Sequence, residues 1–168
     1  MRGHLQLELR DESGGVIARR AVWNTVMQSG ASIVAELFAG QGAPISHMGV
    51  GTSDLAPDDT AVTTLANEPV GESPALVGET LTPIVPASVT FETDSVKRHI
   101  RVRLRATLPA EAAVGRIREA GLISLAPDGV TARLYNRVTF APIDKGDDHE
   151  LSLFWEVAFP FGDLSFSF

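Results

Sequence analysis

The chain has 168 residues, enough for one domain with a sizeable core, and it has no cysteine, which excludes disulfides, thiolate nucleophiles and cysteine-based metal sites. Its 14 Lys and Arg against 21 Asp and Glu give a net charge of −7, so we expect neither nucleic acid nor a membrane as a partner. No apolar run approaches the roughly 20 residues of a membrane-spanning helix, and the first residues do not resemble a secretory signal.

Alternating apolar and polar residues predict strands through most of the chain. Residues 4–10 place Leu5, Leu7 and Leu9 on one face, and residues 16–23 resume a strand after a glycine pair, which predicts a hairpin. The other strand candidates are residues 45–51, 88–93, 100–107, 116–125, 131–140 and 149–159. This spacing predicts a mainly β chain, an antiparallel β-sandwich or barrel, as one domain over residues 1–168.

One helix is expected in the N-terminal half, beginning near Ser29. Its apolar residues form a single stripe that we expect to pack against the sheet. Asn24 or Ser29 is the expected N-cap, and Gly40 is the expected C-terminal stop. The stripe consists of Ile33, Val34, Leu37 and Phe38.

Two segments between the strands lack a regular pattern. Residues 53–67 read as a polar loop, and residues 68–86 contain four prolines, which permit a surface connection with at most a short edge strand. The hairpin that follows is expected to turn Val89 and Phe91 inward, together with Ile100 and Val102.

No catalytic, cofactor or metal motif is present, so we expect a non-enzymatic protein without a cofactor or metal site. The four histidines fall at or near strand ends and are assigned ordinary structural roles. The acidic residues 144–150 read as a solvated hairpin tip with Gly146 at positive φ, and binding of a divalent ion is the alternative.

Basic residues are concentrated between positions 97 and 105. Arg101, Arg103 and Arg105 share one face of one strand, where they could dock on a carboxylate-rich neighbour. The alternative is that they pair within the chain with acidic residues of the adjacent strand, such as Glu92.

Phenylalanine is enriched at the C-terminus, in residues 160–168. Phe161, Phe166 and Phe168 lie there among small and polar residues, and the last two belong to an alternating apolar pattern. This segment could complete the chain's own sheet or add to the edge of a neighbouring subunit. The predicted interface residues are therefore Arg101, Arg103, Arg105, Phe161, Phe166 and Phe168.

Five segments, in this order, resemble a family of small bacteriophage virion proteins found among tail, neck and fibre-region products. The similarity lies in NTVMQSGASIVAELFAG (24–40), ISHMGVGT (45–52), GTSDLAPDDTAVTTLANE (51–68), REAGLI (118–123) and LYNRVTFAPIDK (134–145). Asp54 stands where the family has a small residue, and the chain extends beyond the family pattern after Phe159.

The resemblance implies a structural component of a phage tail, neck or baseplate, or of a related contractile injection particle. Such a protein would self-associate, contact other virion proteins, and be assembled into the virion in the host cytoplasm. The resemblance supplies no active-site residues. The alternative function is a β-sandwich module that binds a receptor or glycan through Trp23, Tyr135 or Trp155, and a hydrolase that uses His47, His99 or His149 is a third hypothesis.

Overall fold

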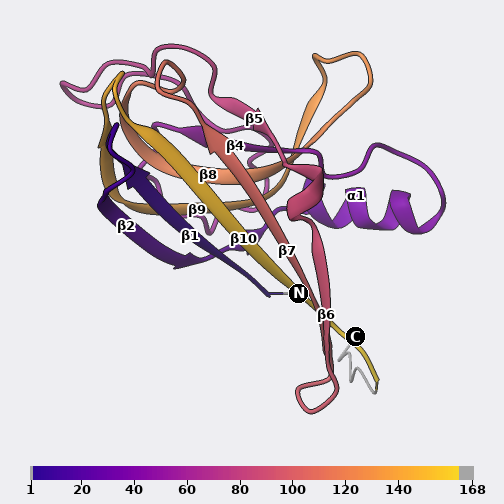
Figure 1. Cartoon of the computed structure of the whole chain (residues 1–168). Coiled ribbons are helices and arrows are strands. Elements are labelled where there is room, and N and C mark those ends of the chain that lie inside the picture. Colours follow the sequence, from indigo (N-terminus) through magenta and orange to yellow (C-terminus); the bar gives the residue numbers. More distant parts are fainter. Residues whose placement is uncertain (1, 163–168) are drawn as a thin grey trace.

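The computed structural model describes residues 2–162, which form two five-stranded antiparallel sheets and one helix (Figure 1). Sheet A has the strand order β2-β1-β10-β7-β6, and sheet B has the order β3-β9-β8-β4-β5. The sheets share an apolar core and are not closed into a barrel, so the chain is a sandwich. The elements are β1 Arg2–Arg10, β2 Val16–Trp23, β3 Thr25–Val26, α1 Gln28–Phe38, β4 His47–Gly51, β5 Leu81–Pro83, η1 Pro86–Ser88, β6 Thr90–Asp94, β7 His99–Leu108, β8 Gly115–Leu125, β9 Ala132–Lys145 and β10 Glu150–Pro160.

The predicted strands and their inward faces are largely confirmed. β1 pairs with β2, and β6 pairs with β7, as the alternation indicated. Leu5, Leu7 and Leu9 are fully or almost fully buried, as are Leu151 and Leu153 of β10. The long connection from 68 to 86 contributes one short strand, β5, at the edge of sheet B.

Helix α1 is confirmed, but its predicted N-cap is wrong. Met27 precedes the helix and makes no side-chain cap hydrogen bond. Ser29 lies inside the first turn, where its hydroxyl donates instead to the carbonyl of Leu134 at 2.5 Å. Asn24 lies between β2 and β3 and is not the capping residue. Gly40 adopts φ +73° directly after the last turn, as expected for a glycine that ends a helix.

The polar loop of residues 53–67 lies over the outer face of sheet B. Its Val62 and Leu65 pack against Met27, Ile123 and Leu134, which form a second, smaller apolar cluster. Because Ile123 and Leu122 are neighbours on β8, they point to opposite faces, and Leu122 belongs to the main core. Sheet B is therefore covered on both faces.

The β6–β7 hairpin and the end of β10 extend past the body of the sandwich as an arm (Figure 1). The prediction that Phe91 points into the core is wrong, since its side chain is 72% exposed. Phe91 shares the inner face of sheet A with its directly paired neighbour Val102, and sheet B would bury this face if it continued opposite the arm. The arm extends beyond sheet B, so the side chain of Phe91 stays exposed.

Candidate interaction site

An apolar groove lies at the open end of the sandwich, between α1 and the inner face of sheet A. Its volume is about 330 Å³. Tyr135 is the one lining residue with a polar side-chain group, and burial raises the pKa of its phenol to about 12. The walls are Ile33, Val34 and Leu37 of α1, Val102 and Leu104 of β7, Val157 and Phe159 of β10, and Ile45, Ile84, Val89, Leu122 and Tyr135.

The groove opens because the helix stripe is only partly covered. Ile33 is buried, as predicted, but Leu37 is 39% exposed and Phe38 is 95% exposed. The expectation that the whole stripe packs on the sheet is therefore wrong at its C-terminal end. There the last helical turn extends past the strands that cover Ile33 (Figure 1).

Exposed apolar side chains continue from the groove onto the arm. Phe91 is beside Val102, and Ile100 is beside Phe159, in the register of β6, β7 and β10. Ile100 and Phe161 are each 40% exposed. We call Leu37, Phe38, Phe91, Ile100 and Phe161, together with the groove, the open-end surface.

Of the predicted C-terminal anchors, the structure places Phe161 alone. Phe166 and Phe168 lie outside the described residues. The backbone N–H of Phe161 donates to the carbonyl of Arg98 at 2.9 Å, so the end of the described chain lies at the tip of the arm. Whether residues 163–168 pair within or between subunits stays a prediction.

The predicted arginine face lies on the outer side of sheet A, and two of its members form ion pairs within the chain. Arg103 contacts Glu92 at 3.0 Å and Glu156 at 3.1 Å. Arg101 contacts the same carboxylates at 3.7 Å and 3.0 Å. The alternative of intramolecular pairing thus describes Arg101 and Arg103.

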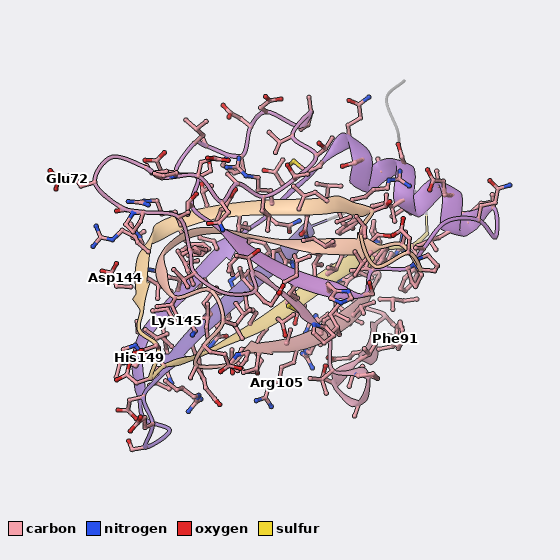
Figure 2. The ribbon with its side chains drawn as sticks, turned by 90° about the horizontal axis from the view of Figure 1, so that it is seen from above. Glu72, Phe91, Arg105, Asp144, Lys145 and His149 are labelled. Atoms are coloured by element: carbon pink, nitrogen blue, oxygen red, sulfur yellow. The ribbon has the colours of Figure 1, made fainter. Side chains whose placement is uncertain are left out.

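Arg105 makes no ion pair among the described residues. Its guanidinium lies 5.6 Å from the ring centre of Phe154 and projects from the sandwich (Figure 2). It borders a shallow hollow of about 560 Å³ across β1, β10 and β7 that also includes Gln6 and His4. The ring of Trp23 lies next to the ring of His4, with 5.0 Å between the two ring centres, and Trp23 is 70% exposed. Arg105 is therefore the predicted arginine that keeps an unpaired charge.

Asp144 and Lys145 of the acidic turn at 144–150 form hydrogen bonds with residues elsewhere in the same chain. Arg116 donates to both oxygens of Asp144, at 2.6 and 2.8 Å, and these hydrogen bonds hold the pKa of Asp144 below its ordinary value. Lys145 turns inward and donates to the carbonyls of Pro109 and Ala110, and burial lowers its pKa. Asp144, Lys145 and His149 lie together at one end of the molecule (Figure 2). Across residues 2–162 no group of three or more His, Asp or Glu side chains could hold a metal ion.

The prediction of positive φ at Gly146 is wrong. The turn closes instead through its N–H, which donates to Nδ1 of His149 at 3.0 Å. An added Cβ at Gly146 would overlap a carboxylate oxygen of Asp148, an exposed side chain that can rotate away.

A buried ion pair on the outer side of sheet B was not predicted. Nε of Arg137 donates to Glu119 at 2.6 Å, with 3% and 1% of the two side chains exposed. The other Glu119 oxygen accepts from the N–H of Ala66 at 2.7 Å, and Arg137 also donates to Ser53 at 2.9 Å. The pair thereby fixes both ends of the covering loop. The sequence provides little signal for this pair, because β8 and β9 carry other charged residues as well: Arg116, Arg118, Arg133, Asp144 and Lys145.

The histidines of the hydrolase hypothesis do not meet. His47 contacts the neighbouring Ser46, His99 contacts Arg101, and His149 contacts Asp148. Within the described part of the chain, no hydrogen bonds or ion pairs join a serine, a histidine and a carboxylate as a set.

Comparisons with protein-family models, with curated proteins and with solved structures found no match. Among residues 2–162, no helix is long and apolar enough to cross a membrane. Functional arguments therefore depend on the residues and surfaces described above.

Proposed function

We propose that this chain is a non-enzymatic building block of a virion, in a phage tail, neck or baseplate or in a related contractile injection particle. It acts by packing against copies of itself and against neighbouring virion proteins. The observation that carries the proposal is the open-end surface, where five large apolar side chains flank an apolar groove. Monomeric proteins rarely expose apolar patches larger than a few hundred Å², and larger patches mark interaction sites.

The composition of this surface suits assembly better than catalysis. Phenylalanine provides three of its five exposed side chains, and aromatic residues are enriched at the centres of protein interfaces. Each aromatic side chain can bury about 150–250 Å². Burying a fully exposed phenylalanine side chain contributes roughly 1.5–3 kcal/mol before the entropic cost of association.

The test is the solution mass of the purified chain, by size exclusion with light scattering at two concentrations. The proposal predicts a discrete oligomer whose population grows with concentration. A strict monomer at both concentrations would contradict self-assembly.

A second candidate function, a receptor- or glycan-binding module, is favoured by the exposure of Trp23. An exposed aromatic ring beside a polar hollow is a suitable platform for a sugar ring. Tyr135 and Trp155, the other aromatic residues considered, are buried. A glycan array tests this candidate, with Trp23→Ala expected to abolish any hit and Ile17→Ala, an exposed apolar residue on the same strand, expected to retain it.

A further inference from the structure

The groove is large enough to receive side chains from another segment. Its volume of about 330 Å³ is at the lower end of the roughly 300–1,000 Å³ typical of ligand pockets. Its lining residues are apolar apart from the hydroxyl of Tyr135. The groove therefore suits an apolar segment that turns no charged group inward.

The chain carries such a segment immediately beyond the described residues. Residues 163–168, Asp-Leu-Ser-Phe-Ser-Phe, place Leu164, Phe166 and Phe168 at alternate positions. In an extended conformation these three would share one face, with the two serines on the other. Six extended residues reach about 20 Å, long enough to cross a groove between a helix and a sheet.

The direction of β10 favours the groove of another subunit. Val157 and Phe159 line the groove, and the chain then continues past Pro160 toward the arm tip, where Phe161 contacts Arg98. The described chain therefore ends at the far end of the arm, with β10 running away from its own groove.

The extent of the exposed surface also favours a second copy. Phe38 is on the helix side of the groove and Phe91 is on the arm side. A six-residue segment could fill the groove between them but would leave both rings largely exposed. A second subunit would add its own arm to the cover.

We infer that the groove receives residues 163–168 of a second copy of this chain, an inference that rests on the self-assembly proposed above. In a dimer with a two-fold axis, the arm tip of each subunit would lie beside the groove at the base of the other subunit's arm. Residues 163–168 of each subunit would then fill the groove of the other. The four phenylalanine rings exchanged would bury roughly 600–1,000 Å². With a comparable area lost from the grooves and arms, the contact reaches the roughly 1,200–2,000 Å² of a stable interface.

Cysteine cross-linking tests the location of the segment, because the chain has no cysteine of its own. The variants Leu37→Cys and Leu164→Cys are prepared separately and mixed under mild oxidation. Any disulfide between positions 37 and 164 then joins two different chains. The matched control pairs Leu164→Cys with Glu12→Cys, an exposed position in the β1–β2 turn at the opposite end of the sandwich (Figure 1).

The inference predicts a 37–164 disulfide, identified by peptide mass spectrometry, at least tenfold more abundant than the 12–164 disulfide. Equal yields would overturn it. So would a fast-migrating, internally cross-linked monomer as the main product of the double variant Leu37→Cys/Leu164→Cys, because the segment would then occupy its own groove.

A tail variant separates this inference from the proposed function. Phe166→Ser/Phe168→Ser is expected to stay folded by circular dichroism and to become monomeric, whereas Ser165→Ala/Ser167→Ala keeps the parent mass. If the phenylalanine variant remains oligomeric, the inference fails and self-assembly stands. If it unfolds, the segment belongs to its own core and the inference fails. A monomeric parent chain would contradict both this inference and the proposed self-assembly.

Discussion

Replacing Glu119 by Gln should destabilise the fold strongly, although the two side chains have nearly the same shape. The carboxylate accepts from Arg137 through one oxygen and from the N–H of Ala66 through the other. In Gln one of these oxygens becomes an NH2 donor, so it must face either the guanidinium or the Ala66 N–H. The substitution therefore leaves a buried charge uncompensated and removes one acceptor.

Breaking a buried ion pair from one side costs about 3–5 kcal/mol. For a chain of this length, 1 kcal/mol shifts the midpoint of thermal unfolding by about 2–4 °C, so Glu119→Gln is expected to lower Tm by roughly 6–20 °C. The free energy of unfolding is measured by urea denaturation, followed through the fluorescence of the buried Trp155.

The matched control is Glu92→Gln, which removes the same charge from the exposed arginine network. Glu92 is 53% exposed in its side chain and should cost no more than about 1 kcal/mol. Equal effects of the two substitutions would refute the assignment of Glu119 and Arg137 as the pair that fixes the covering loop.

Three further predictions concern single residues. The chain has one tyrosine, so an absorbance titration reports Tyr135 directly; its midpoint should be near 12 in the folded protein and near 10.0 after denaturation. Because the folded pKa is the higher one, the stabilisation linked to Tyr135 is complete below pH 10.0 and is lost as the pH rises toward 12, which urea titrations across this range would show. Gly30→Ala should reduce the free energy of unfolding by about 1–3 kcal/mol, because an added Cβ would overlap the carbonyl of Tyr135; an unchanged urea midpoint would contradict this packing. Asp144 has a lowered pKa, so its stabilisation is present above its ordinary value of 3.8 and is lost as the pH falls through the lowered pKa; Asp144→Asn should weaken the acid dependence of stability between these pKa values.

Local patterns were sufficient to predict most of the strands. In β1 and β10 the alternation identified the buried residues correctly, because one face of each strand meets the core and the other meets solvent. Glycine also marked the end of the helix correctly, at Gly40.

The open-end surface could not be predicted in the same way. Alternation places Phe91 on the inner face of its strand, but it does not show whether a second sheet continues opposite that strand. The helical spacing likewise groups Phe38 with Ile33, although the sheet supports only the first turns of the helix. Both residues are exposed because of the relative lengths of elements far apart in the sequence.

The buried pair required long-range information of another kind. Glu119 and Arg137 become neighbours through the β8–β9 register, and they are buried because residues 53–67 cross over them. The pair thereby holds this loop on β8 and β9.

Light scattering on Phe38→Ser/Phe91→Ser, measured beside the parent chain, tests whether the chain assembles through its open end. Both side chains are largely exposed, so the substitutions should leave the fold intact. Ile17→Ser/Val77→Ser, which removes two exposed apolar side chains away from the open end, is the control. We expect a discrete oligomer for the parent and the control, and a folded monomer for Phe38→Ser/Phe91→Ser. An unchanged oligomer in that variant, or a monomeric parent, would contradict assembly through the open end.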